Sequence, residues 1–422
     1  MPPRGSPGPQ IVALLALLVA ARSGHAQSPS ALGLQTDTLR LTLAEARSLA
    51  LEASPELRAA RMDTAIARGE LKQAGVLFRN NPWVDVLTGT PGTEVGVSQE
   101  LEVAGQRGAR RAAAFAGVER ARASVLDTTR ITLGEVDRRF FRLAAANERA
   151  TLALEGLSLN ERLAAATRQQ LGAGKISKLE DNLATVELGR SRARSLATKR
   201  ERERFESDLR VVLGLPPRQP IAPIVDSTLT PNPRHVLVDV GVDSLTSLAL
   251  SRRPDLIALA ATARQARALA STARREAFPN LSIRVSSQRT EGTGTRVLRP
   301  GVGLSVPIFN RNRGDVEART AEARKADLQG AALAAEIRLD VARSWDAYLS
   351  GNAETDLLQN TVLAPARENR RLLEIAYREG KVGLPVVLLI RNQVIDAELD
   401  YWAAWLAERE ALTDLVLATG GP

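Results

Sequence analysis

The residue types that most often perform catalysis or hold a metal are scarce in this sequence. It has no cysteine, and its two histidines, His25 and His235, lie far apart. A transition-metal site needs a cluster of imidazoles or thiolates, and a Ser–His–Asp triad needs a histidine with partners, so neither can be assembled. We therefore expect no enzyme, no catalytic or metal site, and no cofactor.

One short segment, Gly172-Ala173-Gly174-Lys175, has the composition of a phosphate-binding loop. No Ser or Thr follows the lysine and no strand precedes it, so the pattern fails its structural test. A turn between two helices fits better, because glycine readily ends a helix. Glu180 and Asp181 follow the turn, and Ser177 with Glu180 has the spacing of a capping box. Helix capping is the first interpretation of this acidic pair.

Residues 1–26 have the pattern of a signal peptide. Arg4 precedes an apolar stretch from Ile11 to Ala21, which ends in the small-residue cleavage site Gly24-His25-Ala26. The chain has 57 basic and 48 acidic residues, a net charge of +9, which is common in nucleic-acid-binding proteins. Export, and the spread of these charges along helical faces, predict solvated surfaces and no nucleic-acid partner.

The sequence contains an internal tandem repeat of one unit. Ser54-Pro55-Glu56-Leu57 matches Arg253-Pro254-Asp255-Leu256 after 199 residues, and Gly174-Lys175-Ile176 matches Gly380-Lys381-Val382 after 206. We expect a first repeat over residues 27–215, a Pro-rich connector over 216–241, and a second repeat over 242–422.

Each repeat contains one very long predicted helix, over residues 105–171 and 313–379, and Pro365 is the single proline in the two stretches. A helix of 67 residues extends roughly 100 Å at 1.5 Å per residue. Apolar residues recur at spacings of three and four, as at Val136 and Phe140 or Val341 and Trp345. Such a narrow seam predicts long antiparallel rods packed side by side, as in a coiled coil.

Alternating apolar and polar residues predict one β-hairpin per repeat, over residues 82–101 and 279–309. No later stretch is apolar and long enough for a membrane helix, so a membrane span must use strands. Four strands cannot close a membrane barrel alone, so we expect an oligomer. Four aromatic residues flank the strands and suit an interfacial girdle, with ordinary packing at the helix–strand junctions as the alternative: Phe78, Trp83, Phe278 and Phe309.

This doubled order resembles the TolC-like outer membrane efflux family. The resemblance covers nearly all of the mature chain and is carried by the paired hairpins, the basic Gly-containing strand exits at residues 105–108 and 311–314, the paired helix turns, and the closing Leu213-Gly214 and Thr419-Gly420. It implies a mainly α fold with membrane β-hairpins. Three protomers would each give four strands to one α/β-barrel tunnel in the outer membrane, with a large periplasmic portion.

The resemblance also implies a function and partners. Residues 99–108 look most like the heavy-metal resistance (Czc-type) branch of the family. The expected function is an outer-membrane channel subunit of a tripartite efflux system. It would pass small solutes or metal cations from an inner-membrane pump of the resistance-nodulation-division type and a periplasmic adaptor. The exit duct of a type I protein secretion system and an exported helical scaffold remain alternatives.

Two candidate sites follow from the resemblance. The helix turns are expected to form a tip that docks the adaptor's helical hairpin, with Leu384 as an exposed apolar contact; the tip candidates are Gly174, Lys175, Ser177, Gly380, Lys381, Val382, Gly383 and Leu384. Alternatively to capping alone, Glu180 and Asp181 would form an acidic gate ring that attracts cations. The matching segment of the second repeat, residues 386–390, is apolar and lacks the gate aspartates of some members.

Overall fold

The computed structural model describes residues 38–90, 92–225, 241–290, 294–379 and 381–421. The predicted signal peptide, most of the Pro-rich connector with His235, and Gly380 lie outside the described residues. In the described part, no helix has both the length and the apolar character needed to cross a bilayer.

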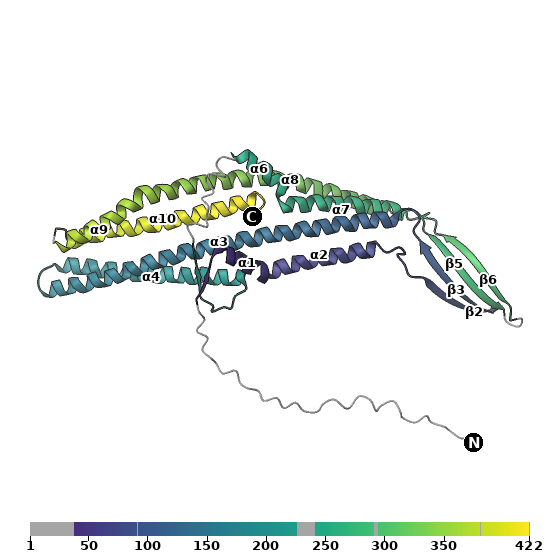
Figure 1. Cartoon of the computed structure of the whole chain (residues 1–422), viewed down its shortest axis with the longest axis horizontal. Helices are drawn as coiled ribbons and strands as arrows, with labels where there is room; N and C mark the ends of the chain where they lie inside the picture. Colours follow the sequence, from purple (N-terminus) through teal and green to yellow (C-terminus); the bar gives the residue numbers. More distant parts are fainter. Residues whose placement is uncertain (1–37, 91, 226–240, 291–293, 380, 422) are drawn as a thin grey trace, which may run out of the picture. The chain divides into compact units, whose positions relative to one another are not determined.

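The two halves contain the same order of elements (Figure 1). The first half consists of α1 (Leu43–Ala53), α2 (Pro55–Ala74), β2 (Trp83–Gly89), β3 (Gly92–Leu101), α3 (Gln106–Gly172) and α4 (Lys178–Leu213). The second consists of α6 (Gly241–Arg252), α7 (Pro254–Glu276), β5 (Leu281–Thr290), β6 (Arg296–Leu304), α8 (Arg313–Leu357), η1 (Leu358–Leu363), α9 (Ala364–Arg378) and α10 (Leu384–Ala418). The expectation of a mainly helical fold with few strands is confirmed.

Local sequence explains where the helices begin and end. Thr42 caps α1 and Ser177 caps α4, each in a full capping box with the glutamate three residues later. Pro55 and Pro254 take the first position of α2 and α7, where a missing N–H costs nothing. Gly214 ends α4 with a left-handed φ of 64°, a conformation that glycine adopts easily.

The helices lie side by side. Towards the strands, α3 packs against α2 and α7, and α7 against α8; at the other end, α3 packs against α4 and α10, and α10 against α9 (Figure 1). Many buried residues of α3 and α7 are alanines, whose small side chains let helix axes approach closely: Ala113, Ala116, Ala121, Ala263, Ala266 and Ala270. The alanine-rich faces of the long predicted rods therefore serve helix packing.

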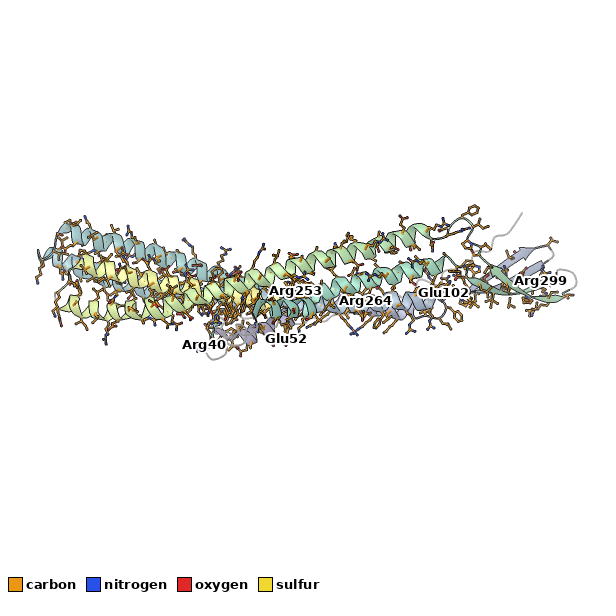
Figure 2. The ribbon with its side chains drawn as sticks, turned by 90° about the horizontal axis from the view of Figure 1, so that it is seen from above. Arg40, Glu52, Glu102, Arg253, Arg264 and Arg299 are labelled. Carbon is orange, nitrogen blue, oxygen red and sulfur yellow. The ribbon has the colours of Figure 1, made fainter. Side chains whose placement is uncertain are left out.

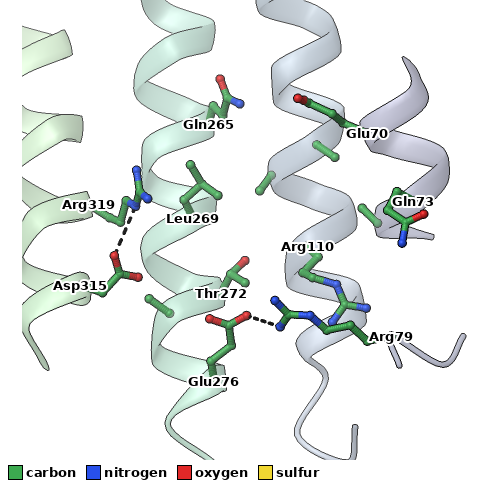
Figure 3. A pocket seen from close by; sticks show the side chains of 14 residues that line it. Glu70, Gln73, Arg79, Arg110, Gln265, Leu269, Thr272, Glu276, Asp315 and Arg319 are labelled. Carbon is green, nitrogen blue, oxygen red and sulfur yellow. Dashed lines mark hydrogen bonds and ion pairs between the residues drawn. The ribbon is translucent and has the colours of Figure 1, made fainter. Parts of the chain in front are cut away.

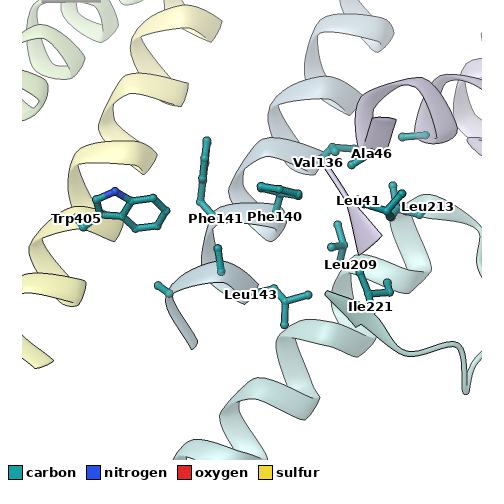
Figure 4. Close-up of a cluster of buried hydrophobic side chains, with 13 residues drawn as sticks. Leu41, Ala46, Val136, Phe140, Phe141, Leu143, Leu209, Leu213, Ile221 and Trp405 are labelled. Atoms are coloured by element: carbon teal, nitrogen blue, oxygen red, sulfur yellow. The ribbon is translucent and has the colours of Figure 1, made fainter. Parts of the chain in front are cut away.

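The largest apolar cluster lies midway along α3 (Figure 4). Phe141 stands edge-on to Phe140 and to Trp405 of α10, with ring centroids 5.8 Å apart in both pairs. Two short parallel strands, β1 (Leu39–Leu41) and β4 (Ile221–Pro223), contribute Leu41 and Ile221 to the cluster. The chain segments that contain β1 and β4 are thereby held against the middle of the helical bundle.

The second long helix differs from its sequence expectation. α3 is an unbroken helix of 67 residues, within one residue of the predicted 105–171. The predicted continuous helix over 313–379 instead contains six π-helical residues, η1, between α8 and α9. Pro365 explains the wider turn, because proline cannot donate an N–H and its ring conflicts with the carbonyl four residues earlier.

The four long strands form one antiparallel sheet in the order β2-β3-β5-β6. The strands lie within the two predicted hairpins, and the halves of the chain meet where β3 pairs with β5. β2 and β6 are the two edges of this sheet.

Candidate functional site

One face of the sheet is apolar and uncovered. Successive side chains of a strand point to opposite faces, so the register places alternate residues of all four strands together. The apolar members of this face are each at least 42% exposed: Val84, Val86, Val95, Val97, Ile283, Val285, Leu298, Val302 and Leu304. A contiguous apolar surface of this size is rare on a soluble monomer and fits contact with lipid.

The opposite face is polar. It carries the carboxylates of Asp85, Glu94 and Glu100 and the guanidinium groups of Arg284 and Arg299, and most of its other positions are Gly or Ser. Figure 2 shows Arg299 on the sheet and Glu102 at the junction with the helices. A sheet with one lipid-compatible face and one hydrophilic face is the arrangement of a pore wall.

The four girdle candidates lie at the helix end of the sheet, and all four are exposed. Phe78, Phe278 and Phe309 occupy the connections between helices and strands. Trp83 differs, because it pairs with Ser98 and therefore shares the polar face with Asp85. The girdle stays a prediction for the three phenylalanines, while the register places Trp83 away from the apolar face.

A hydrogen-bonded cluster joins sheet and helices. The Glu100 carboxylate accepts bonds from Asn80 (2.6 Å) and Asn280 (2.9 Å), and the buried Gln106 side chain donates to Asn280 (3.0 Å). Asn80 and Asn280 each follow a phenylalanine by two residues, 200 residues apart. Extending the repeat alignment through these residues would have found the pair.

An open cleft lies beside this junction, between α2, α3, α7 and α8 (Figure 3). Arg79, just after α2, forms a 2.8 Å ion pair with Glu276 of α7, and Asp315 lies 3.5 Å from Arg319 on α8. One of these pairs joins the two halves of the chain and the other lies within α8, so the charges serve to hold the helices around the cleft.

The two helix turns lie at the opposite ends of the long helices from the strands (Figure 1). Gly174 has a φ of 68°, as a reversing helix often requires. Lys175, Ser177, Lys381 and Gly383 are exposed, and Val382 is half-buried. Lys381 pairs with Glu379 at 2.5 Å.

Leu384 is not at the surface, contrary to expectation. It is 6% exposed and packs against Ala164 of α3 and Ala184 and Leu188 of α4. Leu179, Leu183, Val386 and Leu389 are exposed apolar residues beside the turns. Leu384 is not available for an apolar contact with a partner, because it holds α10 against the other half of the chain.

Glu180 and Asp181 have different surroundings. The Glu180 carboxylate accepts bonds from the Ser177 N–H (2.9 Å) and hydroxyl (3.0 Å), which confirms the capping box. Asp181 is buried, its Oδ2 is 2.6 Å from Lys178 Nζ, and its Oδ1 has no hydrogen-bond partner among the described residues. The gate role stays a prediction.

Sequence reasoning missed the buried Arg391 on α10. Its guanidinium donates to Asn160 Oδ1 (2.6 Å) and to the Gly156 carbonyl (2.7 Å), both on α3. Burial lowers the pKa of Arg391 to about 10, because removing the guanidinium from water disfavours its charged form more than the Glu187 carboxylate favours it. No local pattern could reveal this contact, since the residues are more than 230 positions apart.

Comparison with known proteins shows which proteins the chain resembles. Residues 245–421, in the second half of the chain, match the family model described as Outer membrane efflux protein. The chain also has the fold of solved structures over nearly its whole length. It matches a membrane protein from Pseudomonas aeruginosa with a TM-score of 0.72 and 20% identity, over 92% of both chains. It matches CusC with a TM-score of 0.71 and 18% identity, over 90% of this chain and 92% of that one.

A curated relative adds a more particular likeness. The cobalt-zinc-cadmium resistance protein CzcC of Cupriavidus metallidurans is 24% identical over 367 residues, which cover 86% of this chain and 85% of CzcC. The resemblance to the TolC-like outer membrane efflux family inferred from the sequence is confirmed.

Proposed function

We propose that this chain is the outer-membrane exit duct of a tripartite efflux system, with its helices in the periplasm. One observation carries the proposal: a sheet with an exposed apolar face and a charged opposite face continues into helices of up to 67 residues. A lipid-embedded strand region on long helices suits a conduit that crosses the outer membrane and reaches toward an inner-membrane pump. The family match over residues 245–421 supports the same function.

Three copies would complete the membrane region. Because β2 and β6 each have a neighbour on one side only, their outer backbone groups would be unpaired in lipid, at a cost of several kcal/mol per group. Pairing β6 of one copy with β2 of the next gives a closed barrel of twelve strands.

The assembly is tested by measuring the mass of the mature protein after detergent extraction from outer membranes. We expect a trimer that needs detergent for extraction. A monomer in mild detergent, or protein released without any detergent, would contradict this arrangement.

The cargo we propose is small cationic solutes, with divalent metal ions as the first candidates. The likeness to CzcC along most of both chains supports this choice. Deleting the gene should lower resistance to Co²⁺, Zn²⁺ or Cd²⁺, and the intact gene should restore it. Normal metal resistance with loss of a secreted polypeptide would instead support a type I secretion duct.

The partners we propose are a periplasmic adaptor at the helix turns and a pump of the resistance-nodulation-division type. The exposed Leu179, Val386 and Leu389 give the turns an apolar surface, and the exposed Lys175 lies beside it. Affinity purification of the tagged protein after crosslinking should recover both partners.

A further inference from the structure

The polar face of the sheet contains a three-residue ion bridge that spans strands from both halves of the chain. The Arg284 Nη2 on β5 lies 2.5 Å from Asp85 Oδ2 on β2 and 3.3 Å from Glu94 Oε1 on β3. β3 lies between β2 and β5, so the Arg284 side chain crosses a complete strand to reach Asp85.

Gly96 of β3 provides the path for this crossing. It pairs with Asp85 on one side and Ser286 on the other. A Cβ atom at Gly96 would lie 2.8 Å from Asp85 Oδ1 and 2.9 Å from Arg284 Nη2. The guanidinium therefore passes directly over the glycine, and any larger residue there would displace it.

The single nitrogen Nη2 sits where a bound cation would sit. Two carboxylate oxygens from neighbouring strands lie within 3.3 Å of it, and paired carboxylates are common ligands of divalent cations. A pore wall with a free pair of this kind would retain the cationic cargo proposed above. An arginine is always charged at physiological pH and cannot be displaced by diffusion, so it keeps the pair occupied.

We infer that Arg284 is a built-in counter-ion of the pore wall: its single positive charge offsets one of the two negative charges of Asp85 and Glu94, shifts the charge selectivity of the strand region away from cations, and prevents divalent cations from binding there. This inference rests on the proposed function, because it requires the polar face to line the pore. Arg299 on the same face forms no ion pair with another described residue and provides a matched comparison.

The test uses the full mature protein in planar lipid bilayers. The reversal potential in a KCl gradient gives the K⁺/Cl⁻ permeability ratio, and Zn²⁺ added to the outer side probes the carboxylate pair. Arg284→Gln should raise the permeability ratio roughly twofold to tenfold, because every copy loses one positive charge on the pore wall. It should also make the current sensitive to Zn²⁺ at roughly millimolar concentration.

Three further variants separate local from general charge effects. Arg299→Gln removes the same charge from the same face and should change selectivity without creating the Zn²⁺ block. The triple variant R284Q/D85N/E94Q should abolish the block, because it also removes the carboxylates. If R284Q fails to assemble, D85N/E94Q decides the question: it leaves the arginine uncompensated and should shift the permeability ratio toward Cl⁻.

The outcomes distinguish this inference from the proposed function. A wild-type protein that forms no conducting channel would contradict the proposed function itself. A conducting R284Q channel with unchanged selectivity and no Zn²⁺ block would overturn the inference alone. A lower thermal stability of the R284Q oligomer with unchanged selectivity would likewise overturn it, and would show that the bridge only holds the sheet together.

Discussion

The two helix turns differ in chemistry although the chain reverses in the same way at both. Ser177 and Gly383, 206 residues apart, are the N-caps of α4 and α10. Ser177 caps its helix with its hydroxyl, whereas Gly383 makes no side-chain bond and Pro385 in the first turn presets the helical φ. The chain therefore reverses direction at both turns, but the two following helices use different residues to cap and start their first turn.

The position four residues further on is more informative. Asp181 in α4 and Val387 in α10 are again 206 residues apart, and their exposed fractions are 5% and 7%. One half of the chain fills this buried position with a carboxylate and the other with an apolar side chain. Packing alone thus requires only a buried side chain, so the charge of Asp181 needs a separate reason.

The largest predicted effect concerns Leu384, the first residue of α10, whose first turns are apolar. Leu384→Asp should lower the apparent unfolding free energy by about 3–5 kcal/mol, because it removes an apolar contact and buries a charge. Thermal unfolding and protease sensitivity near residues 379–384 would measure the change. Leu389→Asp is the control: Leu389 is 61% exposed, so this variant should keep normal stability and lose efflux-dependent resistance. Wild-type resistance of L389D would mean that the adaptor docks elsewhere.

A smaller effect on stability is expected when Asp181 is replaced by valine, the residue at the matching position 387. Asp181→Val should raise the apparent unfolding free energy by about 1–2 kcal/mol, because Asp181 Oδ1 is buried without a partner among the described residues. Its thermal midpoint compared with wild type checks this. A large loss of stability would instead show that the contact with Lys178 outweighs the burial cost.

The double variant E180A/D181N tests the acidic gate directly. It should reduce cation preference in bilayer recordings if both carboxylates face the constriction of the channel. Unchanged selectivity would remove them from the pore and leave capping as the role of Glu180. Lys178→Gln, which changes a neighbouring charge of opposite sign, is the matched control.

The smallest effects concern the caps. Ser177→Ala should cost about 1 kcal/mol, since the N–H of Glu180 loses its acceptor. Gly383→Ser should stabilise by a few tenths of a kcal/mol or slightly more, because Gly383 has an extended φ of −84° that serine adopts easily. Circular-dichroism melts of the two variants would measure the changes, and equal shifts of the same sign would contradict the difference between the turns.

Features that depend on near neighbours in the sequence could be predicted. The extent of α3 and the capping boxes at Thr42 and Ser177 follow from local periodicity and spacing, and the structure has them as expected. The strands, too, lie within the predicted hairpins because period-2 alternation is a local signal.

Features that depend on distant partners could not be predicted. From sequence alone, the Leu384 side chain next to the turn could be either exposed or buried. Only its packing against Ala164 and Leu188, which are distant in the sequence, shows that it is buried. The polar-face position of Trp83 follows from a register set by strand pairing. The Arg391–Asn160 and Arg284–Asp85 contacts join residues roughly 200 positions apart, which no window of sequence can reveal.

The π-helical segment before Pro365 coincides with a difference in length between the two halves. Matching residues in the middle of the long helices, such as Leu143 and Tyr348, are 205 positions apart and both fully buried, whereas the N-caps Ser177 and Gly383 are 206 apart. The second half therefore has one extra residue between these points, where η1 lies. A π turn absorbs a single inserted residue without unwinding the helix. The segment thus accommodates the one-residue difference in length between the halves, because the helix continues on both sides of it.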